Sequence, residues 1–88
     1  MSTKESELYI SDTDIEIEHS LVLYNSLHVY DDVVNQLHKA TGYDLIQCEQ
    51  IAIIAHTKGK AVVKSGEIPS LQKINSVLKE IDLVTEIV

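Results

Sequence analysis

The first half of the chain passes from an alternating pattern to a helical one. Apolar and polar residues alternate at residues 14–18, and a β-prone run follows as far as Tyr24, so we predict a first strand over about 15–24. The next apolar residues have the spacing of one helix face, and they are Val29, Val33, Leu37 and Ala40. Gly42 is suited to the position just after a helix end, which predicts a helix over about 29–41.

The middle of the chain predicts a second helix in which apolar residues are not confined to one face. Asp44 precedes Gln47 by three positions, as in a capping box, and Gly59 is placed to end the helix. The body over residues 46–55 is apolar nearly all round, which is typical of a buried helix. We therefore expect this helix to lie in the middle of the fold.

The last part of the chain predicts a strand, a helix and a closing strand. A strand over 60–64 is followed by the turn residues 65–66, and Pro69 suits the first turn of a third helix. The apolar stripe of that helix is Leu71, Ile74, Leu78 and Ile81. Alternation over 83–88 predicts a last strand. The order β-α-α-β-α-β predicts an α+β fold with three helices packed on one face of a small antiparallel sheet.

The length and composition fit one domain with an N-terminal extension. The 88 residues leave no room for a second domain, and a hydrophobic content of 44% is enough for a folded core. Residues 1–13 are acidic and rich in Ser and Thr, so we expect a flexible arm there and a folded domain over 14–88.

The charge of the chain excludes several classes of partner. The net charge is −7, and all the cationic residues are lysines, without one arginine. Arginine is the usual bidentate reader of phosphate and guanine, so we expect no binding to nucleic acid or to an anionic membrane surface.

The polar, acidic start does not resemble a signal peptide, and no apolar run reaches the roughly 20 residues that span a bilayer. Cys48 is the only cysteine, which excludes an internal disulfide and fits a cytoplasmic protein.

Three stretches of the chain together resemble the ClpS family of protease adaptors. Residues 21–25 form an apolar strand that runs into an asparagine, and residues 49–61 form a helix that ends in the family's His-x-x-Gly-Lys signature. Residues 78–88 are similar to the closing helix and strand of adaptors from a Bacteroidetes-like branch. The resemblance covers about residues 19–88 in the family's order, and the second stretch is its most specific part.

The resemblance implies a binding function without a chemical step. Adaptors of this family bind the N-terminal residue of a protein with a bulky hydrophobic N-degron and deliver the protein to a Clp-type AAA+ unfoldase. The roles of the family's asparagine and histidine, which hold the α-ammonium group, fall on Asn25 and His56. The apolar pocket for the first side chain is assigned to Leu23, Tyr30, Val33, Ala52 and Ala55. We expect a monomer with no cofactor, no metal and no catalytic residues.

The chain departs from the family beside the asparagine. The family has acidic residues there, whereas this chain has Ser26 and Leu27, and its loop is one residue short. Loss of a charge-assisted hydrogen bond to the ammonium would weaken binding by about tenfold to a hundredfold. Asp31 or Asp32 would replace the missing charge if the shorter loop turns either one inward.

Alternative interpretations of the same residues stay open. Asn25 at a strand end commonly makes a turn or caps a helix, and His56 in a last helical turn commonly interacts with the helix dipole. The chain would then be a ClpS-like interaction module that no longer binds N-degrons. An enzyme or metal protein is a weaker alternative, because the remaining histidines, His19, His28 and His38, have no metal-ligand spacing.

Overall fold

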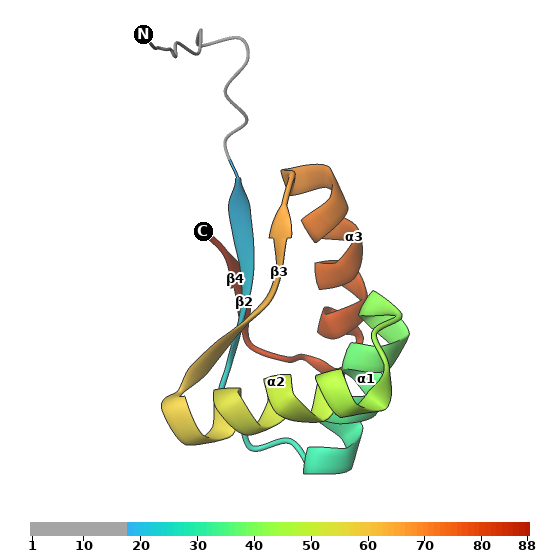
Figure 1. The fold of residues 1–88 in the computed structure, drawn as a ribbon, viewed down its shortest axis with the longest axis vertical. Helices are drawn as coiled ribbons and strands as arrows, with labels where there is room; N and C mark the ends of the chain where they lie inside the picture. Colours follow the sequence, from blue (N-terminus) through green and yellow to red (C-terminus); the bar gives the residue numbers. More distant parts are fainter. Residues whose placement is uncertain (1–17) are drawn as a thin grey trace, which may run out of the picture.

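The computed structural model describes residues 18–88 and shows an α+β fold of seven short elements (Figure 1). The elements are β2 (His19–Tyr24), α1 (Tyr30–Thr41), α2 (Leu45–Lys58), β3 (Lys60–Gly66), α3 (Ile68–Leu78), the 3₁₀ helix η2 (Lys79–Ile81) and β4 (Thr85–Ile87). The predicted order and fold class are confirmed. The expected arm at 1–13 and the predicted start of the strand at 15–17 lie outside the described residues.

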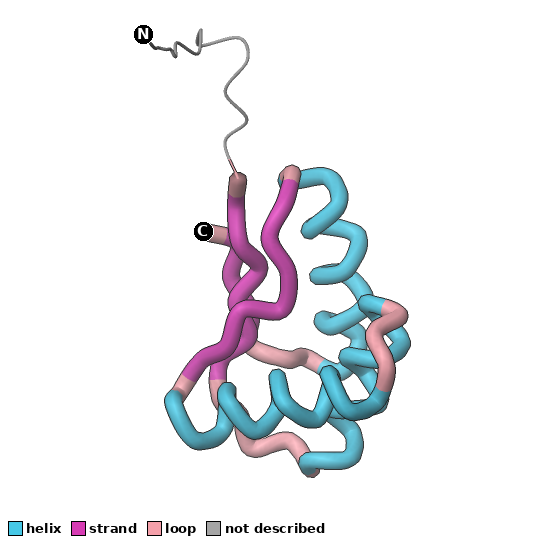
Figure 2. The backbone as a smooth tube through the Cα atoms, viewed as in Figure 1, coloured by secondary structure: helices cyan, strands magenta, loops and turns pink. Residues whose placement is uncertain are grey.

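The sheet has three antiparallel strands in the order β3-β2-β4, with β2 in the centre. Along β2, Tyr24 pairs with Lys60 and His19 with Gly66, and a β-bulge interrupts the register between Leu21 and Val22. Figure 2 shows the three helices gathered on one side of this sheet. The loop that leaves the end of β2 at Tyr24 therefore runs directly towards the helical layer.

Local sequence rules explain where α1 ends and where α2 begins and ends. α1 ends at Gly42, whose φ of 76° is in the left-handed region that favours glycine. The backbone N–H of Gln47 donates to the Asp44 carboxylate at 2.8 Å, which caps the start of α2 as predicted. Gly59 ends α2 with a φ of 93°, also as predicted.

The core lies between the sheet and the helices. Its members are the buried apolar side chains Leu21, Leu23, Val34, Leu37, Cys48, Ile51, Ala52, Ala55, Ala61, Val63, Leu71, Ile74, Leu78 and Leu83. Cys48 packs here as a small apolar residue, and burial raises the pKa of its thiol. The core residues come from all three α-helices, from β2 and β3, and from Leu83 before β4, so the described residues fold around one centre.

The prediction that the second helix lies in the middle of the fold is wrong. Ile53 and Ile54 are each 42% exposed, and Ile46 is 71% exposed, because α2 covers the core with one face and presents the other to solvent. The predicted stripe of the first helix is also shifted. Val34 and Leu37 are buried in α1, whereas Val29 precedes the helix and is 65% exposed.

The third helix is shorter than its apolar stripe suggested. α3 ends at Leu78, and η2 carries Ile81 into a turn at Asp82, whose φ of 58° is left-handed. The last strand is correspondingly reduced to Thr85–Ile87. Backbone hydrogen bonds from Ser20 to Val88 and from Val88 to Ser20 continue the pairing to the final residue.

Candidate functional site

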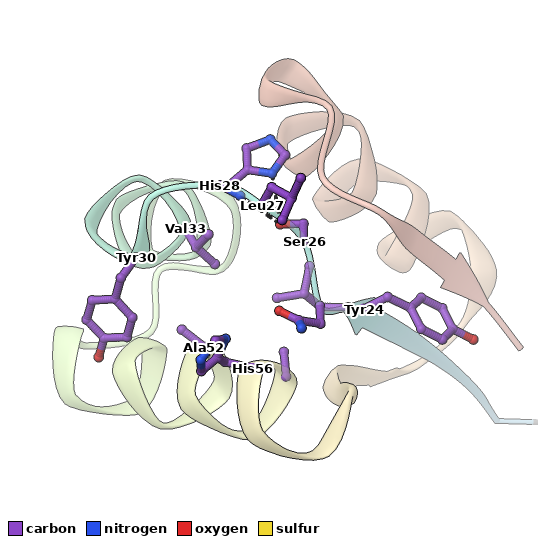
Figure 3. A pocket seen from close by; sticks show the side chains of 11 residues that line it. Tyr24, Ser26, Leu27, His28, Tyr30, Val33, Ala52 and His56 are labelled. Atoms are coloured by element: carbon purple, nitrogen blue, oxygen red, sulfur yellow. Dashed lines mark hydrogen bonds between the residues drawn. The ribbon is translucent and has the colours of Figure 1, made fainter.

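A cavity of about 480 Å³ opens where the end of β2 meets α1 and α2 (Figure 3). We call it the main cavity, and it is lined by Leu23, Tyr24, Asn25, Ser26, Leu27, His28, Tyr30, Val33, Ala52, Ala55 and His56. Its size is within the range of about 300–1,000 Å³ that is usual for small-ligand sites. Every residue to which the resemblance assigns the ammonium contact or the apolar pocket lines this cavity.

One backbone hydrogen bond brings the two ends of the main cavity together. The N–H of Asn25, just after β2, donates to the carbonyl oxygen of Gly59, just after α2, at 2.9 Å. The left-handed φ of Gly59 turns the chain sharply from α2 into β3, and His56 lies one helical turn before it. The strand end with Asn25 and the helix end with His56 are therefore held beside each other.

Small side chains on α2 leave the space that the main cavity occupies. Ala55 and His56 follow Ala52 by three and four residues, so each of them is a neighbour of Ala52 on the surface of the helix. Both alanines are buried, whereas Asn25 and His56 are exposed. Figure 3 shows Ala52 and His56 facing Val33 and Ser26 across the opening. The deep alanine wall of the cavity is therefore apolar, and the polar side chains of Asn25 and His56 are accessible on its walls.

The loop over residues 25–29 is fixed by a hydrogen-bond network through His28. Its Nδ1 lies 2.8 Å from the hydroxyl of Ser26, and its Nε2 bonds the backbone carbonyl of Ile81 in η2. A carbonyl only accepts, so Nε2 carries the proton and, in the neutral ring, Nδ1 accepts from the Ser26 hydroxyl. The network therefore connects the rim of the main cavity to η2.

The walls of the main cavity carry no carboxylate. Asp31 and Asp32 lie in the exposed first turn of α1, and the structure brings neither of them to the lining. Negative charge is nevertheless close to one wall. Partial burial raises the pKa of Tyr30, and the nearby carboxylates of Glu49 and Asp31 raise that pKa further. Two carboxylates therefore lie near the Tyr30 wall without lining the main cavity.

Tyr24 has a different role on the opposite wall. Its hydroxyl donates to the Glu86 carboxylate at 2.7 Å, and this hydrogen bond is the main reason why the pKa of Tyr24 is raised. Figure 3 shows the ring directed along the strand and away from the opening. The Tyr24 hydroxyl therefore bonds a residue of β4 and does not point into the main cavity. Asn25, Ser26, His28 and His56 are polar side chains that line it.

Sequence reasoning did not assign Tyr24, Leu27 or His28 to the site. Tyr24 and Leu27 flank Asn25 and Ser26 in sequence, so the loop position was a usable signal for them. His28 gave no such signal, because its role depends on the carbonyl of a residue 53 positions away. Sequence reasoning also missed Glu49, which lies on α2 one turn before Ala52. Its carboxylate is close enough to contribute to the raised pKa of Tyr30.

The described residues offer little for other kinds of site. Within residues 18–88, no group of three or more His, Cys, Asp or Glu side chains is arranged to hold a metal ion. No helix in the same part of the chain is both long enough and apolar enough to cross a membrane. The main cavity is therefore the candidate functional site of the described residues.

Comparison with protein families identifies the group to which this fold and cavity belong. The family model described as ATP-dependent Clp protease adaptor protein ClpS matches residues 16–82, which is most of the chain. A comparison with curated proteins gave no match. The family match covers every element from β2 to η2 and the whole lining of the main cavity. The chain belongs to the ClpS family of ATP-dependent Clp protease adaptors.

Proposed function

We propose that this adaptor binds the N-terminal residue of substrate proteins in the main cavity and delivers them to a Clp-type AAA+ unfoldase in the cytoplasm. The observation that carries the proposal is one apolar cavity with Asn25 and His56 accessible on its walls. The family is one of adaptors and not of enzymes, which fits a role without a chemical step.

The polar groups on the walls suit an α-ammonium group. An ammonium has three N–H donors and no acceptor, so it needs acceptor atoms around it. The amide oxygen of Asn25 and an unprotonated ring nitrogen of His56 are such acceptors. The Ser26 oxygen is available less freely, because it already accepts from the backbone N–H of His28 at 3.4 Å. Two neutral acceptors make the contact weaker than a carboxylate would, since charge-assisted hydrogen bonds are roughly twice as strong.

The apolar interior suits a large first side chain. Leu23, Val33, Ala52 and Ala55 present only carbon atoms from their side chains, so a polar first residue would lose its hydrogen bonds to water. With alanine at two of these positions, the volume of about 480 Å³ suits Leu, Phe, Tyr or Trp. We therefore assign the first-residue preference to bulky hydrophobic side chains.

The replacement of the family's acidic pair by Ser26 and Leu27 favours a second candidate function. The lining of the main cavity contains no carboxylate. The same lining would suit a module that binds an unfoldase or another protein without reading N-degrons. The two functions differ in one measurable property, which is dependence on a free amine.

Fluorescence anisotropy with labelled decapeptides distinguishes the two functions. The peptides begin with Leu, Phe, Tyr or Trp and are compared with their N-acetylated forms. We expect binding that needs the free amine and that falls at least tenfold in His56→Ala, since a buried hydrogen bond to a charged group is worth about 1.5–3 kcal/mol. His19→Ala is the matched control, because His19 is at the opposite end of β2. Equal binding of free and acetylated peptides, or no binding by the folded protein, would reject N-degron reading.

A further inference from the structure

A shallow second hollow adjoins the main cavity on the side of the loop. We call it the side hollow, and it is lined by Ser26, Leu27, His28 and Val84. The first three residues also line the main cavity, so the loop is a common wall between the two depressions. The N–H of Tyr24 donates to the carbonyl of Val84 at 2.8 Å, and this bond fixes Val84 beside the loop.

The side hollow presents apolar side chains to water. Leu27 is 104% exposed and Val84 is 51% exposed. The loop that carries Leu27 is fixed by the bonds of His28 to Ser26 and to Ile81. An exposed apolar side chain on a loop whose backbone is fixed gains free energy when a partner covers it, and the loop itself need not be reordered.

We propose that the side hollow binds the second side chain of the bound N-terminus and selects an apolar one. This inference rests on the proposed function. Successive side chains of an extended peptide point in opposite directions, so a peptide with its first side chain inside the main cavity directs the second away from it. The common wall of Ser26, Leu27 and His28 makes the side hollow continuous with the rim of the main cavity, so it is an adjacent place for that second side chain.

The lining of the side hollow also indicates what it discriminates against. It contains no carboxylate, lysine or arginine, so a charged second side chain would find no ion-pair partner there. Two half-covered methyl groups are worth on the order of 1 kcal/mol, which corresponds to about fivefold in affinity. We therefore expect a peptide with Val at the second position to bind about fivefold more tightly than the same peptide with Ser.

The test uses two labelled decapeptides that begin Leu-Val and Leu-Ser and are otherwise identical. In the unaltered protein we expect the Leu-Val peptide to bind about fivefold more tightly. Leu27→Ser and Val84→Ser should each reduce this ratio towards one. Val62→Ser is the matched control, because Val62 is a 56% exposed valine of β3 that lines neither depression, and it should retain the full ratio.

Each outcome decides one of the two proposals. Equal affinity for Leu-Val and Leu-Ser peptides, or a preference that survives in both Leu27→Ser and Val84→Ser, overturns the side hollow while amine-dependent binding stands. A ratio that falls equally in Val62→Ser also overturns it, because the effect is then not local. Absence of binding by either peptide, in protein shown to be folded by circular dichroism, overturns N-degron reading and the side hollow together.

Discussion

Replacement of Ser26 by aspartate tests whether the main cavity is short of one negative charge. Ser26 lines the cavity beside Asn25 and is half-buried, so a carboxylate there would lie within reach of a bound ammonium. Two unit charges about 4 Å apart attract by about 1 kcal/mol in water and about 4 kcal/mol at the effective dielectric constant near a protein surface. A half-buried site falls between these limits, so we expect Ser26→Asp to raise the affinity for a free-amine Leu peptide about tenfold to a hundredfold.

Three controls make the result specific. Ser26→Asn has the shape of aspartate without its charge and should give no comparable gain. Ser70→Asp makes the same change in net charge at an exposed position of α3, away from the cavity, and should leave affinity unchanged. The acetylated peptide should gain nothing, since it has no ammonium.

The assay is anisotropy at low salt and about pH 8, where an imidazole is ordinarily neutral. The new carboxylate would lie beside the His28 ring, which bonds Ser26 in the unaltered protein. If Ser26→Asp binds the free-amine peptide no more tightly than Ser26→Asn does, the ammonium does not lie where Asn25 and Ser26 could contact it.

Four further predictions follow from the described contacts. Glu49→Gln should weaken peptide binding about twofold at low salt and have no effect at high salt, because the Glu49 carboxylate acts on the mouth of the cavity from a distance through water; anisotropy at two salt concentrations tests this. Gly59→Ala should lower the free energy of unfolding by about 1–2 kcal/mol, since the φ of 93° strains any residue with a Cβ. An added Cβ would meet no atom within 4 Å, so a steric clash would not contribute to the loss. Urea unfolding tests this, and an unchanged midpoint would contradict it. Leu78→Ala should cost about 2–5 kcal/mol because it is fully buried, whereas Leu45→Ala, 49% exposed, should cost far less in the same assay. Glu80→Gln should destabilise the protein slightly at neutral pH and not at all in strong acid, because hydrogen bonds from Lys39 and Gln36 lower the pKa of Glu80. The stabilisation by Glu80 is therefore present above its ordinary pKa and is lost as the pH falls through the pKa of the folded state. Urea unfolding at the two pH values tests this, and equal effects at both would refute it.

The elements of the fold could be predicted because their limits are set locally. Gly42 and Gly59 end helices through backbone conformations that glycine adopts without strain, and Asp44 caps a helix with its own side chain. The burial of α2 could not be predicted in this way. Apolar residues lie on every side of α2, but whether Ile53 and Ile54 are covered depends on how many layers the fold has. The local sequence pattern does not contain the number of layers.

The candidate site was only partly accessible from sequence. Asn25 and His56 were assigned by resemblance, and both line the main cavity with all five assigned pocket residues. Asp31 and Asp32 were not brought there, because the first turn of α1 presents Tyr30 and Val33 to the cavity and leaves the two aspartates exposed. The network from Ser26 through His28 to Ile81 joins residues far apart in sequence, so only the three-dimensional structure reveals it.

The most direct test of N-degron reading in the main cavity is an NMR titration of ¹⁵N-labelled protein with an unlabelled Leu peptide and its acetylated form. We predict that the free-amine peptide shifts the backbone amide signals of Asn25, Ser26, Ala52, Ala55 and His56, which surround the main cavity, and that the acetylated peptide leaves them in place. Shifts of the same size with the acetylated peptide, or shifts centred on α3 and the outer residues of β3, would contradict the proposal that this cavity holds an N-terminal residue.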